Sequence, residues 1–199
     1  MRAIVEARTG LEVKAVISNR PEAQGLEWAK AQGIATAVVD HKAFPTREAF
    51  DAAMGDAIAG FSPDLVLLAG FMRIFTPQLI ARFPRRILNI HPSLLPAFPG
   101  LHTHRAALAA GVKVHGCTVH VVTPSLDSGP IVVQGAVPVL PGDTEESLAE
   151  RVLRTEHRIY PQAIRWFLED RIEFLPGDVV RIRDSGVSSD YLVSPRDSR

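Results

Sequence analysis

The sequence predicts an α/β fold, an open, mostly parallel, twisted sheet with helices on both faces. Short apolar segments alternate along the chain with segments whose apolar residues recur at helical spacing, which is the order that βαβ units produce. Residues 64–69 and 86–90 are rich in Leu, Ile and Val, as parallel strands covered on both faces are. The length of 199 residues suits one domain with a sizeable core.

Ordinary helix and strand signals bound the elements of the first half. Met1–Arg8 has apolar residues at helical spacing and precedes Thr9-Gly10, so we expect a short opening helix. Gly33 and Pro63 mark the ends of two further helices. With these stops, the expected elements are strands at 13–18, 36–39, 64–69 and 86–90 and helices at 21–32, 46–61 and 76–83.

The second half adds further strands and one long helix. Glu146 follows Asp143 by three residues, a variant of the capping box, so we expect Asp143 to cap a helix that runs to about residue 170. Pro161 predicts a kink near Tyr160. The other expected elements are a helix at 102–111, strands at 115–123 and 131–139, and a hairpin at 172–182 that turns at 176–178. We expect one domain over residues 1–184 and a frayed polar tail at 185–199.

Composition excludes several classes of partner. The 22 basic and 22 acidic side chains balance, so no global charge favours nucleic acid or an anionic membrane. Cys117 is the only cysteine, which excludes an internal disulfide and fits a reducing cytosol. The longest apolar run, Leu65–Gly70, is too short to span a bilayer, and no signal peptide is visible. We expect a soluble, cytoplasmic protein that acts on small molecules.

Polar side chains gather where two expected strands end. Asn89 and His91 lie at the exit of the strand at 86–90, and Asp127 lies in the loop after the strand at 115–123. Ligands of open α/β sheets bind at the carboxyl ends of strands. An amide, an imidazole and a carboxylate together suit proton transfer beside a developing oxyanion, with the carboxylate orienting the imidazole. The sequence therefore predicts a catalytic site here.

Other residues near this site have competing interpretations. His120 alternates with valines, so it either faces solvent or lies under the site and supports His91. His102, His104 and His115 could join His91 as metal ligands, but their spacing lacks a helical His pair with an acidic partner, so we expect no metal site. Cys117 is most simply a small buried side chain.

Four motifs in this region resemble those of the phosphoribosylglycinamide formyltransferase family, folate-dependent enzymes of purine synthesis with a Rossmann-like sheet. The motifs are Asn89-Ile90-His91-Pro92-Ser93-Leu94-Leu95-Pro96, Gly100-Leu101-His102-Thr103-His104, His115-Gly116-Cys117-Thr118-Val119-His120 and Asp127-Ser128-Gly129-Pro130-Ile131. The resemblance continues through Ala69–Ile74 upstream and Glu156–Pro161 downstream, and it covers about residues 13–174.

The resemblance implies transfer of a formyl group from 10-formyltetrahydrofolate, a co-substrate, to the amine of N1-(5-phosphoribosyl)glycinamide in de novo purine biosynthesis. Asn89 would donate to the oxyanion, and protonated His91 would do likewise or deliver a proton to the leaving nitrogen. Asp127 would hold His91 cationic. The resemblance implies no tightly bound cofactor, no metal, and a monomer or homodimer.

The resemblance also implies residues that bind the two substrates. Glu156 would contact the ribonucleotide. The residues around the folate would be Arg47, Met72, Arg73, Ile74, Phe75, Asn89, Thr123, Pro124, Ser125, Leu126 and Asp127.

Two alternative functions use the same site. In a formyltetrahydrofolate hydrolase, water would replace the amine, and a non-catalytic chain would only bind folate. The methionyl-tRNA formyltransferase and the formyltetrahydrofolate deformylase share the Asn-x-His core but usually carry an Arg-Gly-Ala or Gly-Ala sequence followed by a proline where this chain has residues 100–104. That segment favours the ribonucleotide enzyme.

The start of the chain departs from the family pattern. Family members begin with an apolar strand and a Gly-x-Gly-Ser-Asn loop that leads into a helix, and Met1–Ala7 resembles that helix. We therefore expect the true start to lie upstream, where the genomic sequence would encode the strand and the loop. If the chain as written is the whole protein, we expect weak ribonucleotide binding, low stability and little turnover, because the loop would hold the phosphate.

Overall fold

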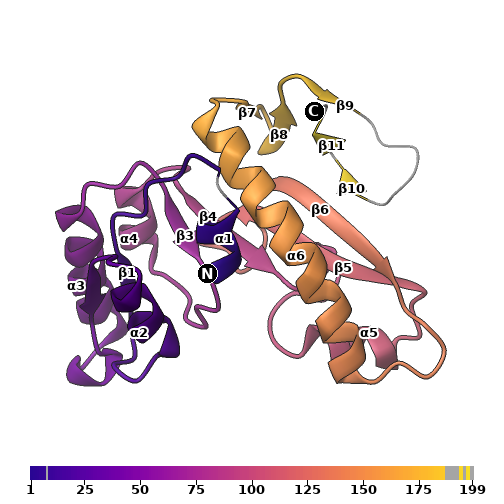
Figure 1. Ribbon diagram of the computed structural model, residues 1–199, viewed down its shortest axis with the longest axis horizontal. Helices are drawn as coiled ribbons and strands as arrows, with labels where there is room; N and C mark the ends of the chain where they lie inside the picture. Colours follow the sequence, from indigo (N-terminus) through magenta and orange to yellow (C-terminus); the bar gives the residue numbers. More distant parts are fainter. Residues whose placement is uncertain (8, 187–192, 195, 198–199) are drawn as a thin grey trace. The chain divides into compact units, whose positions relative to one another are not determined.

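The computed structural model describes residues 1–7, 9–186, 193–194 and 196–197. They form two compact units, one of residue 1 with residues 12–87, the other of residues 2–11 with the described residues from Leu88 onward. Helices and strands alternate along the chain. The predicted α/β class is confirmed (Figure 1).

The unit that contains residues 12–87 is built from short strands and three α-helices. Strands β1 and β2 pair in parallel, with Val16 opposite Thr36. The three strands are shorter than the predicted segments 13–18, 36–39 and 64–69. The elements are β1 (Val16–Ser18), α2 (Gln24–Ala31), β2 (Thr36–Val38), a 3-10 turn (His41–Ala43), α3 (Arg47–Gly60), β3 (Val66–Leu68) and α4 (Pro77–Arg82).

Helix α3 begins and packs as its sequence predicts. The Thr46 hydroxyl accepts a hydrogen bond from the Ala49 N–H at 3.1 Å, which satisfies one of the free donors of the first turn. Phe50, Met54 and Ile58 recur every four residues, so they lie on one face, and all three are buried. This face forms the core of the unit.

The second unit holds an antiparallel sheet and the longest helix. β5 lies between β4 and β6, and β10 pairs with the other edge of β6. Its elements are α1 (Arg2–Glu6), most of β4 (Ile87–His91), α5 (Thr103–Ala109), β5 (Val114–Val121), β6 (Ile131–Pro138), α6 (Glu145–Leu168), β7 (Ile172–Leu175), β8 (Val179–Ile182), β9 (Ser185–Gly186), β10 (Val193–Ser194) and β11 (Arg196–Asp197).

The strand pairs within this unit run antiparallel. The pairs β4–β5, β5–β6 and β6–β10 are all antiparallel. β5 and β6 are joined by residues 122–130 alone, and a parallel pair needs a crossover of about a dozen residues or more. The predicted sheet therefore contains the predicted strands, but their directions are mixed.

Helix α6 lies across β5 and β6 (Figure 1). A Cβ added to Gly135 of β6 would overlap the Thr155 side chain, so the glycine allows helix and strand to approach closely. The Tyr160 hydroxyl donates to the Leu88 carbonyl at 2.9 Å, which ties the helix to β4. The helix is continuous through Pro161.

The cap of α6 is not the predicted one. Thr144 is the N-cap, and its hydroxyl accepts from the Ser147 N–H in a reciprocal capping box. Asp143 instead binds Arg151 through two hydrogen bonds of 2.7 and 2.8 Å. The prediction was wrong by one residue because the long-range pair with Arg151 engages the Asp143 carboxylate.

The chain after α6 turns back as a hairpin. β7 and β8 pair antiparallel with Leu175 opposite Val179, which confirms the hairpin predicted for residues 172–182. In the predicted frayed tail, the structure has three short strands, because free edges such as that of β6 accept partners. The rest of that tail, residues 187–192, 195 and 198–199, lies outside the described residues.

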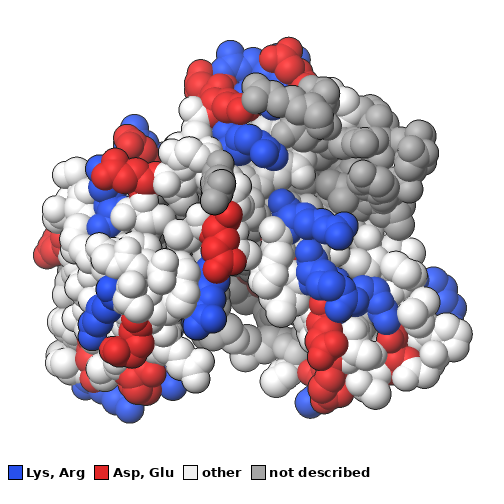
Figure 2. Space-filling model, in the orientation of Figure 1, with Lys and Arg blue, Asp and Glu red and all other residues white. Residues whose placement is uncertain are grey.

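Charged side chains show no separation by sign on the face in Figure 2, where blue and red side chains are interspersed. Among the residues that the structure describes, no helix combines the length and the apolar character needed to cross a membrane.

Candidate active site

Three neighbouring strands of the second unit bring polar side chains to one face of the sheet. In the β4–β5 ladder, Asn89 lies opposite His120 and His91 lies opposite Thr118. In the β5–β6 ladder, Thr118 lies opposite Gln134. Residues two apart on a strand point to the same face. All five side chains therefore share that face.

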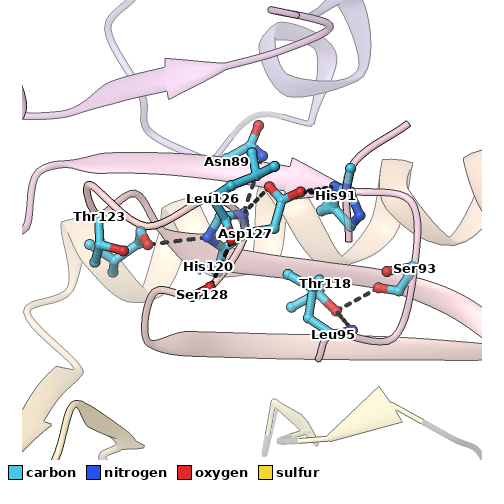
Figure 3. Close-up of polar contacts among 12 residues, drawn as sticks. Asn89, His91, Ser93, Leu95, Thr118, His120, Thr123, Leu126, Asp127 and Ser128 are labelled. Carbon is cyan, nitrogen blue, oxygen red and sulfur yellow. Dashed lines mark hydrogen bonds and ion pairs between the residues drawn. The ribbon is translucent and has the colours of Figure 1, made fainter. Parts of the chain in front are cut away.

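His91 lies between two acceptors, of which Figure 3 shows the Asp127 carboxylate. Its Nδ1 is 3.4 Å from Asp127 Oδ2, and its Nε2 is 3.1 Å from the Phe98 carbonyl oxygen. The side chain is only 7% exposed. Because only the doubly protonated ring donates at both nitrogens, this arrangement accommodates an imidazolium.

Asp127 lies in the loop that follows β5, and its carboxylate is held by a backbone N–H of another loop. The Gly100 N–H donates to Asp127 Oδ2 at 2.9 Å. The Asp127 backbone is left-handed, with φ of 47°, a conformation that aspartate tolerates better than most residues. The Ser128 hydroxyl donates to the Leu126 carbonyl at 2.7 Å and closes the turn. The carboxylate thus faces His91 from a fixed loop.

His120 lies beneath the site, which decides between the two interpretations of its position. Its ring is buried, with Nδ1 3.1 Å from the Val121 carbonyl and Nε2 3.2 Å from Asn89 Nδ2. Burial lowers the pKa of His120, against the opposing effects of the Val121 carbonyl and Asp127. The neutral ring donates through Nδ1 and accepts from the Asn89 amide at Nε2. His120 therefore orients Asn89.

The loop after His91 is attached to β5 through Thr118, a residue that the sequence analysis did not single out. The Thr118 hydroxyl donates to the Ser93 carbonyl at 2.7 Å and accepts from the Leu95 N–H at 3.1 Å (Figure 3). Thr103, at the start of α5, donates to the Pro92 carbonyl at 2.7 Å. The position of Thr118 two residues before His120 on the same face was the signal that could have identified it.

A second histidine pair lies next to this loop. His104 Nδ1 is 3.2 Å from His115 Nε2, and the Phe98 ring packs edge-on against His115 at 5.9 Å. Burial, and then the charge of His104, lowers the pKa of His115 from 6.5 to about 4. His115 is consequently a neutral packing residue at physiological pH.

We expect the free energy of unfolding to fall as the pH drops from 6.5 to about 4. The unfolded chain binds a proton at His115 in this range and the folded chain does not, so acid favours unfolding. Urea unfolding measured across this range should show a flatter pH dependence for His115→Phe than for the wild type. The same substitution at exposed His157 is the control. Equal slopes for wild type and His115→Phe would contradict the prediction.

The predicted folate residues of the first unit lie in the loop between β3 and α4 and at the start of α3. Arg47 donates to the Phe75 carbonyl at 2.9 Å, and the Arg73 guanidinium lies 5.1 Å from the centre of the Phe50 ring. Met72 and Ile74 are exposed, at 72% and 45%. Phe75 is buried, so its ring belongs to the core of this unit.

The remaining predicted residues belong to the second unit. Thr123, Pro124, Ser125 and Leu126 form the loop that leads to Asp127, and Leu126 is 49% exposed. Glu156 lies on α6, where burial raises its pKa. Burial, and then Glu156, raises the pKa of the Cys117 thiol, whose side chain points to the face of β5 opposite to that of Thr118. The structure thus does not bring Glu156 into the contacts around His91.

Metal ligation was the competing interpretation of the histidines. The described part of the chain contains no group of three or more His, Cys, Asp or Glu side chains arranged to hold a metal ion. His91 is engaged by Asp127 and Phe98, and His104 by His115.

Comparison with known proteins gives the same family over most of the chain. Residues 2–164 match the family described as Formyl transferase. A phosphoribosylglycinamide formyltransferase of Escherichia coli (strain K12) is 50% identical over 161 residues, which are 81% of this chain and 76% of the relative. The matched range includes all the residues that surround His91.

Solved structures of proteins with related names also match this chain. The crystal structure of glycinamide ribonucleotide transformylase 1 from Symbiobacterium toebii has a TM-score of 0.87 and 52% identity, and the match covers 91% of this chain and 87% of that one. A formyltetrahydrofolate deformylase from Pseudomonas syringae pv. tomato has a TM-score of 0.80 and 30% identity, over 91% of this chain and 61% of that one. The chain belongs to the formyl transferase family.

Proposed function

We propose that this chain is a phosphoribosylglycinamide formyltransferase of de novo purine biosynthesis. It transfers the formyl group of 10-formyltetrahydrofolate to the amine of N1-(5-phosphoribosyl)glycinamide. The observation that carries the proposal is the convergence of Asn89, His91 and His120 on one sheet face, with Asp127 beside them from the loop after β5. Its support is the 50% identity to an Escherichia coli enzyme of that name.

The reaction exchanges one carbon–nitrogen bond for another. The neutral amine attacks the formyl carbon, and the carbonyl oxygen becomes an oxyanion. The bond from the formyl carbon to N10 then breaks, N10 gains a proton and the new amide nitrogen loses one. The protein therefore has to stabilise negative charge on oxygen and supply a proton to N10.

Asn89 suits the oxyanion. Its side-chain nitrogen carries two hydrogens, and His120 Nε2 accepts one of them at 3.2 Å. The second hydrogen remains for the substrate oxygen. Because His120 is buried and neutral, it fixes the amide without placing a positive charge beside the oxyanion.

His91 suits the proton transfer. Asp127 stabilises its cationic form across the 3.4 Å contact. Catalytic hydrogen bonds are often long before substrate binds and shorten in the complex. In the free protein, His91 Nε2 lies 3.1 Å from the Phe98 carbonyl oxygen and Nδ1 faces Asp127. In the complex, one of these two N–H groups donates instead to the oxyanion or to N10.

The remaining assignments follow from family position. Residues 1–184 act as one formyltransferase domain, with Glu156 contacting the ribonucleotide. The protein works in the cytoplasm as a monomer or homodimer and holds no tightly bound cofactor. The folate is bound by Arg47, Met72, Arg73, Ile74, Phe75, Asn89 and Thr123–Asp127.

The second candidate function is hydrolysis of 10-formyltetrahydrofolate, with water in place of the amine. It is favoured by the 30% identity to a formyltetrahydrofolate deformylase, which shares the fold. The lower identity makes it the weaker candidate.

The absorbance change of formylfolate, measured with and without the ribonucleotide, tests the proposal. Enzyme is used in excess over formylfolate, so that a single turnover gives a measurable change. We expect consumption that depends on the ribonucleotide and yields the formylated ribonucleotide. Consumption without it would indicate the hydrolase, and folate binding without consumption would indicate a non-catalytic protein.

A further inference from the structure

Gln134 extends the polar row of the active site to a third strand. It lies on β6 opposite Thr118, and Thr118 lies on β5 opposite His91. The three side chains share the face of the sheet that carries the site. Gln134 itself is not among the residues in contact with His91, so any effect on the reaction passes through its neighbours.

The hydrogen bonds of Gln134 and Thr118 form a closed set. Gln134 Nε2 donates to the Leu95 carbonyl at 2.8 Å and to Thr118 Oγ1 at 3.0 Å, which uses both of its hydrogens. Thr118 Oγ1 also accepts from the Leu95 N–H at 3.1 Å and donates to the Ser93 carbonyl at 2.7 Å. A hydroxyl has one hydrogen and two lone pairs, so all its bonding capacity is used.

Burial makes these bonds costly to lose. Thr118 and Ser93 are fully buried, and Leu95 is 4% exposed. Removing the Gln134 amide would leave the Leu95 carbonyl and one lone pair of Thr118 without a partner in a place that water does not reach freely. Such an unpaired group costs about 1–3 kcal/mol.

The loop that Gln134 contacts, residues 92–100, makes hydrogen bonds to both His91 and Asp127. It begins directly after His91, and its Phe98 carbonyl accepts from His91 Nε2 at 3.1 Å. Farther along, its Gly100 N–H donates to Asp127 at 2.9 Å. A shift of residues 93–95 would therefore move the carbonyl that orients His91 and the donor that orients Asp127.

We infer that Gln134 is a positioning residue for formyl transfer, acting through Thr118 and Leu95 on the loop that orients His91 and Asp127. The inference rests on the proposed function for its kinetic consequence, while its structural part concerns the loop alone. A residue with only a stabilising role would lower stability and leave kcat of the folded protein unchanged.

The test uses Gln134→Met, which keeps the length of the side chain and removes both donors. We expect kcat to fall about tenfold, the effect of about 1.4 kcal/mol, with little change in KM for either substrate. Gln78→Met on exposed α4 is the matched control and should keep wild-type kcat. A Gln134→Met protein that is folded by circular dichroism and has wild-type kcat would overturn the inference.

A double-mutant cycle tests the route through Thr118. Thr118→Val removes the hydroxyl and Thr118→Ser keeps it, so serine should retain most of kcat and valine should not. If Gln134 acts through Thr118, the losses of Gln134→Met and Thr118→Val should be less than additive. Fully additive losses would contradict this route.

Amide hydrogen exchange gives a readout that does not depend on turnover. The Leu95 N–H should exchange about tenfold faster in Gln134→Met than in the wild type, as loss of about 1.4 kcal/mol of local stability requires. Unchanged exchange would refute the inference even in an active enzyme. If the wild type transfers no formyl group but exchange responds as expected, the proposed function fails while the control of the loop by Gln134 stands.

Discussion

Replacing His91 with alanine should lower kcat for formyl transfer by about a hundredfold or more. The imidazole contacts both Asp127 and the loop carbonyl of Phe98. Its removal deletes the cationic donor while Asn89 and His120 keep their mutual hydrogen bond. The substrates lose a contact made mainly in the transition state, so KM should change much less than kcat.

Single-turnover kinetics with saturating ribonucleotide measures this effect on the chemical step. His157→Ala, at an exposed position of α6, is the control and should match the wild type. Urea unfolding of both variants establishes that they are folded. A His91→Ala protein with kcat within threefold of the wild type would exclude His91 from the proton transfer.

Asp127→Asn provides a check on the same mechanism. The amide still accepts the Gly100 N–H at one atom but carries no charge to stabilise the His91 imidazolium. A loss comparable to that of His91→Ala would show that the pair acts as one unit, because removing either member then removes the same cationic donor.

Local patterns in the sequence predicted most of the elements. Thr46 before an apolar helical stripe, Pro63 after it, and the turn at 176–178 each act within a few residues, and the structure has α3 and the β7–β8 hairpin where these signals predict them. Strand direction depends instead on how far the connection reaches. The sequence pattern of β5 and β6 does not encode direction, so their antiparallel pairing could not be predicted from it.

The site shows the same division between local and long-range information. Asn89 and His91 were identifiable because they lie at the carboxyl end of an apolar strand and Asp127 because it lies in the loop after another, and the family resemblance joined them. Thr118 and Gln134 lie inside strands, and although its spacing from His120 places Thr118 on the face of the site, no pattern in the sequence tells which groups either residue bonds. Their role depends on the register of three strands, which only the structure gives. Asp143 was misassigned for a related reason, since its partner Arg151 lies two turns farther along α6.

Gly129→Ala should have an effect on kcat that approaches that of His91→Ala. A Cβ at this position would overlap the carbonyl oxygen of Val121, which is backbone and cannot move aside as a flexible side chain would. The same carbonyl accepts from His120 Nδ1 at 3.1 Å. The substitution therefore displaces the loop that carries Asp127 and disturbs the histidine that orients Asn89.

We expect Gly129→Ala to lose about 1–3 kcal/mol of unfolding free energy, the usual cost of forcing extra atoms into a packed region. Because a displacement of about 1 Å in reacting groups can cost a hundredfold in rate, kcat should fall by about that factor. Gly60→Ala at the end of α3, where an added Cβ meets nothing within 4 Å, is the control and should keep both stability and rate. Urea unfolding and single-turnover kinetics measure the two effects separately. A Gly129→Ala protein that loses stability but keeps its rate would show that the Asp127 loop tolerates displacement, and catalysis would then depend on Asn89 and His91 far more than on their carboxylate partner.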